Sequence, residues 1–124
     1  MAKKGLGKKE WIIPDCELPL PGEGEAQGHE SVIIVNDNDK DAEIDVKLFF
    51  TDKDCYEGIK WHVGANRVRC FRMNRLEDMC GFEVPLCTQY AMKISSNVNV
   101  VIQYGRLDNT QANLAFYTTL GYHE

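Results

Sequence analysis

The stretch AEIDVKLFF, residues 42–50, decides the fold class. Its apolar side chains at positions 42, 44, 46, 48 and 50 alternate with polar ones at 43, 45 and 47. Strict alternation predicts a strand with one buried face and one face in water, as in an antiparallel sheet. The apolar residues of segments 59–63 and 98–104 repeat the pattern. The chain is therefore expected to be built from half-buried strands.

Several further segments have the composition of strands. The continuous apolar run 32–35 suits a central strand, residues 68–73 and 89–95 are further candidates, and residues 11–13 suit a short edge strand. After residue 115 the chain is rich in β-branched and aromatic residues, so we expect a turn through 108–113 and then a strand.

Polar, proline-rich and glycine-rich stretches separate these strands. NDNDKD, residues 36–41, predicts a hairpin loop, and residues 19–28, with two prolines and three glycines, predict a longer loop. Residues 74–79 fit a single helical turn capped by Asn74. The expected fold is all-β: an antiparallel, jelly-roll-like β-sandwich of about eight strands with at most a short helical turn.

The length of 124 residues fits one domain, and the net charge is -5. We expect a basic flexible tail over residues 1–9 and a single β-sandwich domain over 10–124. The tail carries Lys3, Lys4, Lys8 and Lys9 and contains no acid. The acidic remainder repels nucleic-acid phosphates, so these four lysines are the candidate nucleic-acid contacts.

The N-terminal stretch and the cysteines indicate the compartment. The first residues lack the apolar core of a secretory signal, and no apolar run has the length of a membrane helix. The five cysteines are odd in number and form no C-x-x-C motif, which argues against a disulfide framework. Cys70 and Cys87 are expected to be buried as small apolar residues. These observations predict a cytoplasmic protein.

Two polar groups could form a binding site. His29 and Glu30 open a predicted strand, and Arg106 and Asp108 end another, with Gln111 beyond them. Neighbours on a strand point to opposite faces, so His29 and Glu30 cannot easily serve one site within one chain. Arg106 and Asp108 share a face and suit either a structural ion pair or contacts to a sugar or a second subunit.

No sequence motif for catalysis is present. The chain has no G-x-S-x-G, no P-loop and no H-E-x-x-H, and its three histidines do not show zinc-site spacing. We therefore expect no enzyme, no cofactor and no metal site. An enzyme on a cupin-like jelly roll stays open as an alternative, because it would need clustered metal ligands that spacing alone does not reveal.

Motifs spread over the whole chain carry a family resemblance. They occur in a characteristic order: WIIP (11–14), PG (21–22), HES (29–31), Asn36, DA (41–42), TD (51–52), YA (90–91), SS (95–96), Gln103, RLD (106–108) and Gln111. In this respect the chain resembles the sensory rhodopsin transducer family. The resemblance runs from Trp11 to the C-terminus.

The resemblance implies a fold and a class of function. It implies an eight-stranded jelly-roll-like sandwich, a cyclic homotetramer, and a cytoplasmic signalling module without catalysis that binds a carbohydrate-like ligand or a membrane receptor. His29, Glu30, Arg106, Asp108 and Gln111 match polar residues shared in the family, which favours them as ligand contacts. The alternative is a DNA-binding, transcription-related regulator that uses the basic tail.

Overall fold

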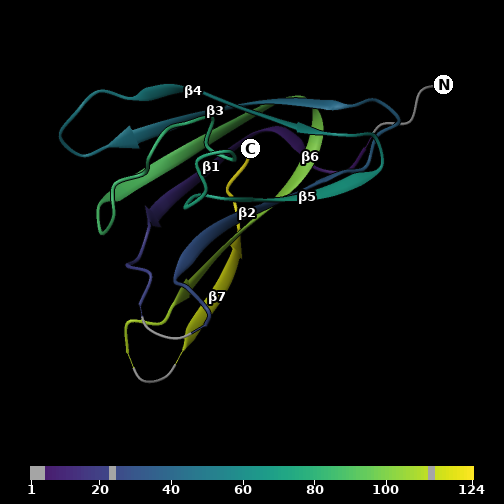
Figure 1. Cartoon of the computed structure of the whole chain (residues 1–124). Coiled ribbons are helices and arrows are strands. Elements are labelled where there is room, and N and C mark those ends of the chain that lie inside the picture. Colours follow the sequence, from purple (N-terminus) through teal and green to yellow (C-terminus); the bar gives the residue numbers. More distant parts are fainter. Residues whose placement is uncertain (1–4, 23–24, 112–113) are drawn as a thin grey trace.

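The computed structural model describes residues 5–22, 25–111 and 114–124, which form seven strands (Figure 1). The strands are β1 (Lys8–Glu17), β2 (His29–Asn36), β3 (Ala42–Phe50), β4 (Tyr56–Val63), β5 (Arg67–Arg72), β6 (Gln89–Asp108) and β7 (Ala115–Leu120). Every ladder between them is antiparallel. No helix occurs within the described ranges. The predicted all-β class is confirmed.

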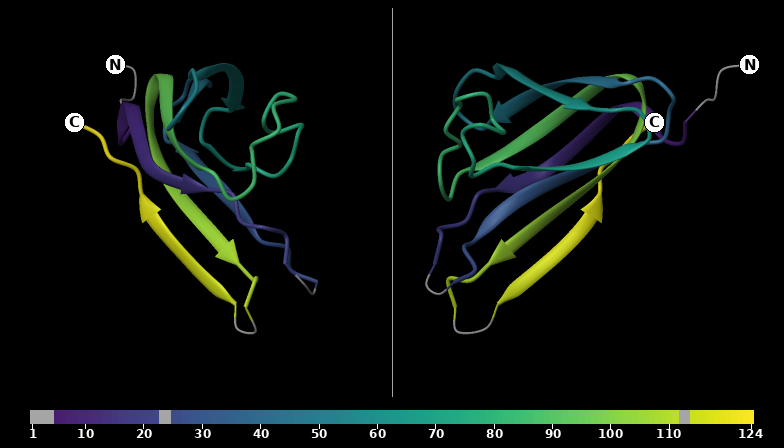
Figure 2. Two further views of the ribbon diagram at one scale, coloured as in Figure 1. Left: turned by 90° about the vertical axis from the view of Figure 1, so that its left-hand side faces the viewer. Right: turned by 45° about the vertical axis from the view of Figure 1, so that its right-hand side comes forward.

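One long strand, β6, joins the two halves of the sandwich. Its first part pairs with β1 and β3, and the β3 ladder reaches Ser96 opposite Ile44. Its second part pairs with β2 and β7, and the β2 ladder begins at Val101 opposite Val35. The first half-sheet has the order β4-β3-β6-β1 and the second has the order β5-β2-β6-β7. Figure 2 shows β6 bending from one half into the other. Each half thus contains four strand segments.

The alternating pattern of β3 places its apolar side chains in the core. Residues 42, 44, 46 and 48 are buried, while Glu43 and Asp45 are exposed. Val46 lies opposite Ile59 of β4 on one side and opposite Ile94 of β6 on the other. A shift of one residue would turn this apolar set into water, so burial fixes the register.

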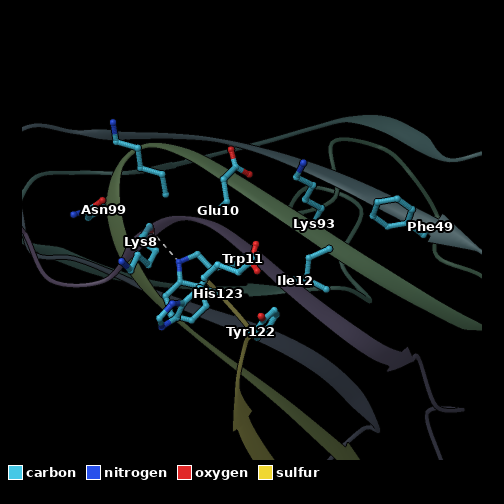
Figure 3. Close-up of a pocket in the computed structure, with 11 residues that line it drawn as sticks. Lys8, Glu10, Trp11, Ile12, Phe49, Lys93, Asn99, Tyr122 and His123 are labelled. Carbon is cyan, nitrogen blue, oxygen red and sulfur yellow. Dashed lines mark hydrogen bonds between the residues drawn. The ribbon is translucent and has the colours of Figure 1, made fainter.

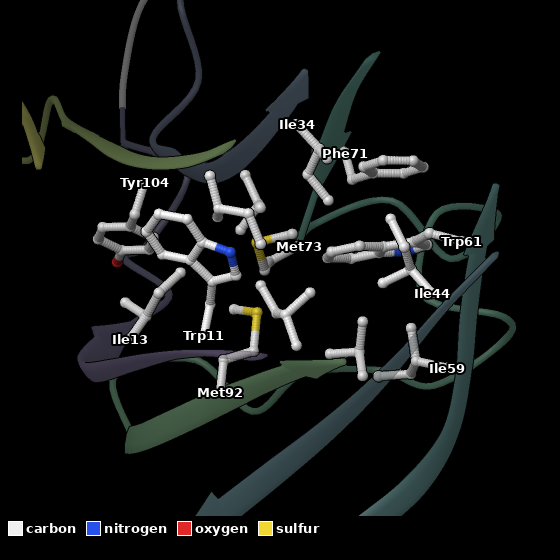
Figure 4. Packing of buried hydrophobic residues seen from close by; sticks show 14 of the residues in the cluster. Trp11, Ile13, Ile34, Ile44, Ile59, Trp61, Phe71, Met73, Met92 and Tyr104 are labelled. Carbon is white, nitrogen blue, oxygen red and sulfur yellow. The ribbon is translucent and has the colours of Figure 1, made fainter. Parts of the chain in front are cut away.

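The core fills the space between the two half-sheets (Figure 4). The ring of Trp61 on β4 stacks on Phe71 of β5, with ring centroids 4.3 Å apart and planes 6° apart. This stack closes the sandwich along the edge where β4 and β5 lie. On the opposite edge, Ile12 of β1 and Tyr122 after β7 exchange two backbone hydrogen bonds of 2.9 and 2.8 Å. Met73 and Met92 are fully buried between them.

A cluster of buried asparagines holds the end of β2 to the bend of β6. The amide nitrogen of Asn36 donates to the carbonyl oxygens of Lys40 and Val63 at 2.9 and 3.1 Å. Its amide oxygen accepts from the backbone and side-chain nitrogens of Asn38, and Asn38 Nδ2 also donates to the carbonyl oxygen of Asn99 at 2.7 Å. These bonds fix the corner where the chain passes from the second half-sheet to the first.

Two expectations about strand pairing need correction. Residues 89–95 and 98–104 were expected as separate strands, but both belong to β6, which explains why seven strands supply eight segments. Residues 36–41 were expected as a hairpin loop, but β2 and β3 do not pair with each other. Both lie on the same side of β6, with β3 along its first part and β2 along its second part, while β1 and β7 lie on the other side. Both strands run antiparallel to β6, so the chain keeps its direction through this loop and continues along the same strand.

The predicted cysteine burial was wrong at both positions. Cys70 and Cys87 are exposed, and Cys16 is the buried cysteine. Cys70 lies on β5, an edge strand whose first four residues are all exposed, and Cys87 lies in a loop with a positive φ of 53°. Neighbouring side chains on a strand point to opposite faces, and on β5 it is Phe71 that faces the core, so Cys70 faces water.

The structure also bears on the predicted helical turn, the C-terminal strand and the strand near residue 11. Residues 74–79 form turns with one α-type hydrogen bond, from Met79 N to the carbonyl oxygen of Arg75 at 3.1 Å. The predicted C-terminal strand is β7, although residues 112–113 of the expected turn lie outside the described residues. The expected edge strand near residue 11 is β1. It begins at Lys8, so the last two residues of the expected flexible tail are strand residues.

Candidate functional site

Glu30 is fully buried at the start of β2 and accepts hydrogen bonds from three donors. The hydroxyl of Tyr90 donates to Oε1 at 2.6 Å, the hydroxyl of Tyr104 donates to Oε2, and the backbone nitrogen of Glu17 donates to Oε2 at 2.9 Å. Donors from β1 and from both parts of β6 therefore meet at one carboxyl group. Buried carboxyl groups need such partners, because burial without them is costly.

Burial sets the ionisation of this cluster. It raises the pKa of Glu30 above its ordinary value of 4.5, against the opposing effect of the hydrogen bonds from Tyr104, Tyr90 and Glu17. Burial and the neighbouring Glu30 carboxyl also raise the pKa of both tyrosines. The thiol of Cys16 has a raised pKa for the same two reasons. Burial disfavours the ionised carboxylate, so Glu30 takes up a proton at a higher pH than an exposed glutamate does.

Arg106 lies beside this cluster, directly opposite Glu30 in the β2–β6 ladder. Its Nε donates to the hydroxyl of Tyr104 at 3.3 Å, and its guanidinium carbon lies 5.4 Å from the ring centroid of Tyr117 on β7. The second terminal nitrogen, Nη2, is buried and has no hydrogen-bond partner among the described residues. A donor of this kind is a candidate contact for a ligand oxygen.

The other predicted site residues do not join Glu30 and Arg106. His29 lies opposite Leu107, one position along the ladder, so it points to the other face. Its Nδ1 lies 2.7 Å from the carbonyl oxygen of Gln27. Asp108 accepts two hydrogen bonds from Thr110, and these bonds lower the pKa of its carboxyl group. Gln111 donates to the backbone oxygen of Asp108 at 3.3 Å, so this pair builds the turn after β6.

A groove of about 450 Å³ runs along the open edge between β1 and β7. Ile13, Pro14 and Asp15 line it from β1, and the rings of Tyr104 and Tyr117 line it from the second half-sheet. Arg106 contacts both of these tyrosines. We call this hollow the tyrosine groove. It combines aromatic surface with a few polar groups, which is typical of small-molecule sites.

A larger hollow of about 710 Å³ lies on the outer face of the first half-sheet (Figure 3). Trp11 and Ile12 of β1, Phe49 of β3, and Tyr122 and His123 after β7 border it. The rings of Trp11 and His123 meet edge to face, with centroids 4.6 Å apart. Three lysines, Lys8, Lys9 and Lys93, also border it. We call this hollow the lysine pocket.

The tyrosines of the site were not identified from the sequence. The signal that points to them is the spacing of Glu30, Val32 and Ile34, which share one face of a strand. A carboxyl group on an otherwise apolar face requires buried donors, and tyrosines on neighbouring strands are the available ones. The lysine pocket had no comparable signal, because its residues are brought together only by the packing of the C-terminal segment over β1.

The four lysines predicted for nucleic-acid binding divide into two pairs. Lys8 and Lys9 belong to β1 and border the lysine pocket. Lys3 and Lys4 lie outside the described residues. The DNA-binding alternative therefore stays a prediction.

Within the described ranges, no group of three or more His, Cys, Asp or Glu side chains could hold a metal ion. The described part of the chain also contains no helix of the length and apolarity that crossing a membrane requires.

Comparison with known proteins places this fold and its motifs in a family. A family model described as Anabaena sensory rhodopsin transducer matches residues 6–123. The crystal structure of Thermotoga maritima 1070 is similar, with a TM-score of 0.85 and 30% identity over 95% of this chain and 96% of that one. The Anabaena sensory rhodopsin transducer has a TM-score of 0.67 and 27% identity over 81% of this chain and 97% of its own. No curated protein sequence matches significantly. The resemblance found in the motifs is confirmed: the chain belongs to the Anabaena sensory rhodopsin transducer family.

Proposed function

We propose that the protein is a non-enzymatic, cytoplasmic signalling module that binds a small carbohydrate-like ligand in the tyrosine groove. The family membership supports the signalling role. The observation that carries the ligand proposal is the buried, unpartnered Nη2 of Arg106 beside the two tyrosines that line the groove. A sugar ring offers an apolar face to an aromatic ring and hydroxyl oxygens to a guanidinium group.

Glu30 acts as a positioning residue in this proposal. Its two carboxyl oxygens are already engaged by Tyr90, Tyr104 and the Glu17 backbone, so it is not itself a ligand contact. Through the hydroxyl of Tyr104 it fixes the ring that lines the groove, and the same hydroxyl accepts from Arg106 at 3.3 Å. The chain Glu30–Tyr104–Arg106 therefore orients the donor that would meet the ligand. Asp108, Gln111 and His29 stay predictions as additional contacts.

Isothermal titration with D-glucose, D-galactose and maltose tests the ligand proposal. We expect at least one of these sugars to bind, and at about 100 times its Kd to raise the unfolding free energy by about 2.7 kcal/mol. Arg106→Gln should abolish the binding. Arg75→Gln, which removes an exposed arginine from the loop after β5, is the matched control and should leave it unchanged. Failure of all three sugars to bind, or equal binding by Arg106→Gln, contradicts the proposal.

We further propose that the module assembles as a homotetramer through β7. All six residues of this strand are exposed, with Phe116 and Leu120 each at 64%. β7 pairs with β6 on one side, and no described strand lies along its other edge. An exposed apolar edge strand offers unpaired backbone groups and apolar side chains, both of which a second copy can cover.

Light scattering after gel filtration tests the assembly. The natural chain should elute as a tetramer, and Phe116→Lys with Leu120→Lys should reduce it to smaller species. Val68→Lys is the matched control, because Val68 is an exposed apolar residue, 59% accessible, on the other edge strand of the same half-sheet. A monomeric natural chain contradicts the proposal.

A membrane receptor is the proposed partner of the assembled module. The support is the family, one of whose members is described as a sensory rhodopsin transducer. The immobilised folded protein should retain an integral membrane protein from detergent-solubilised membranes of the source cells. The heat-unfolded protein is the control. Equal retention by both forms, or by neither, contradicts the receptor proposal.

A further inference from the structure

The lysine pocket is bordered by the C-terminal segment, which pairs with the free edge of β1. Two backbone hydrogen bonds between Tyr122 and Ile12 hold the C-terminal segment on β1. His123 then packs against the edge of Trp11. The hollow beneath has a volume of about 710 Å³ and is separate from the tyrosine groove, although Tyr122 borders both. This volume is within the range of known small-molecule sites, roughly 300–1,000 Å³.

The walls of the pocket offer flat apolar surface and few polar groups. Phe49, Ile12 and Tyr122 contribute side-chain carbon from three different segments. The indole nitrogen of Trp11 is already occupied, because it donates to the carbonyl oxygens of Lys8 and Val100 at 3.0 and 3.1 Å. The walls therefore fit the faces and edges of a planar ring.

The rim of the pocket is locally positive on an acidic protein. Lys8, Lys9 and Lys93 border it, and no described side chain forms an ion pair or hydrogen bond with their ammonium groups. Two acids are also present. The carboxylate of Glu10 accepts a hydrogen bond of 2.6 Å from Ser95, and Glu124 lies at the end of the chain. Among the side chains of this pocket three ammonium groups stand beside two carboxylates, one of which is engaged by Ser95, whereas the whole chain carries -5.

We propose that the lysine pocket binds a small organic anion that joins a flat aromatic ring to one negatively charged group. The ring lies against Phe49, Ile12 and Tyr122, and the anionic group meets the ammonium groups of the lysine rim. Aromatic carboxylates and mononucleotides share this chemistry. The inference does not depend on sugar binding in the tyrosine groove, because the two hollows share only Tyr122 and the Arg106 variant tests only the groove.

Tryptophan fluorescence of the full chain is the first readout, because Trp11 borders the pocket. The probes are benzoate and adenosine monophosphate. Their controls are benzyl alcohol and adenosine, which keep the ring and lose the charge, and inorganic phosphate, which keeps a charge and has no ring. We expect at least one charged aromatic probe to bind with a stoichiometry of one, more weakly as ionic strength rises. Benzoate and adenosine monophosphate, as separate arms, distinguish a carboxylate from a nucleotide ligand.

Lysine variants test the contribution of the rim. Replacing Lys8, Lys9 and Lys93 together by Gln should weaken binding of the charged probe by at least about tenfold, because both charge attraction and steering are lost. Lys40→Gln, in the loop after β2, is the matched control and should leave the affinity unchanged. Circular dichroism melting confirms that the variants are folded. If neither charged probe binds, if the uncharged analogue binds equally well, or if the triple variant keeps its affinity, the proposal is wrong.

Discussion

The two ends of β2 each bury a polar side chain, and the two clusters compensate for burial in different ways. At the end of β2, Asn36 is a neutral amide that donates and accepts, and its partners come from neighbouring loops and from Asn38. At the start of β2, Glu30 is a titratable carboxyl group that only accepts in its ionised form, from Tyr90, Tyr104 and the Glu17 backbone.

This difference separates a structural cluster from a responsive one. An amide keeps the same charge at every accessible pH, so the hydrogen bonds of the Asn36 cluster do not change with pH. The Glu30 cluster changes charge, lies against the tyrosine groove and connects to Arg106 through one hydroxyl. We infer that the Asn36 cluster stabilises the fold equally at every pH, whereas the Glu30 cluster can respond to a ligand or to a proton.

The largest expected effect is on stability. Glu30→Ala should lower the free energy of unfolding by about 4 kcal/mol near pH 5, because three donors lose their acceptor and a cavity forms. Asn36→Ala should lower it by about 2 kcal/mol, because neutral hydrogen bonds contribute less than those to charged groups. Urea unfolding followed by fluorescence measures both. A larger loss for Asn36→Ala would reverse the ranking of the two clusters.

The next effect is the dependence on pH. The pKa of Glu30 is raised above 4.5 in the folded protein, so the folded state binds more protons than the unfolded state between 4.5 and the folded pKa. Unfolding free energy should therefore fall through this window as pH rises, by up to about 1.4 kcal/mol per pH unit. The contribution of Glu30 to the unfolding free energy should be constant below and above the window.

Glu30→Gln isolates this contribution, because the difference between the natural chain and the variant cancels the other titrating groups. The difference in unfolding free energy should shrink as pH rises through the window. Asn36→Ala, measured in parallel, should differ from the natural chain by a constant amount. A difference for Glu30→Gln that grows with pH would mean that the pKa of Glu30 is lowered on folding.

A smaller effect is expected from a single hydroxyl. Tyr90→Phe removes the donor to Oε1 of Glu30 and should cost about 1.5 kcal/mol, since the hydrogen bond serves a charged group. Losing this donor also raises the pKa of Glu30 further, which moves the pH window upward. Tyr122→Phe is the control, because Tyr122 is exposed. Equal unfolding curves for Tyr90→Phe and the natural chain would show that this bond adds nothing.

The mildest probe leaves the fold intact and reports on the Glu30 end. Cys16 is buried beside that cluster and its thiol has a raised pKa, whereas Cys55, Cys70, Cys80 and Cys87 are exposed. A thiol reagent should label four cysteines in the native protein and the fifth only after unfolding. Glu30→Ala should speed labelling of Cys16, and Asn36→Ala should not. Equal rates in the two variants would show that the clusters are not independent.

Alternation along the chain was sufficient to predict the strands and the fold class. It could not predict that one strand would serve both halves, because the polar residues 95–97, SSN, separate two apolar patterns and indicate a break between strands. It also could not predict that the chain continues along β6 after Asn36 and forms no hairpin there. Strand pairing depends on contacts between segments far apart in the chain, and a local sequence pattern carries no information about those contacts.

The site was only partly predictable for the same reason. Glu30 and Arg106 were identified, and the ladder places them opposite each other. Asp108 and Gln111 are polar because they build a turn, which has the same composition as a binding loop. The hollows themselves come from β1, β7 and the C-terminal segment meeting at one edge, which is a property of tertiary packing.

The sharing of β6 also constrains the order in which the fold can form during synthesis. β6 begins at Gln89 and, among the described strands, it alone pairs with β1 or β7, while β3 with β4 and β2 with β5 can pair earlier. A nascent chain that ends before Gln89 can hold at most two separate strand pairs and an unpaired β1. The sandwich therefore closes only after most of the chain has been synthesised, and until then the apolar faces of the two strand pairs lack β6 as their common partner.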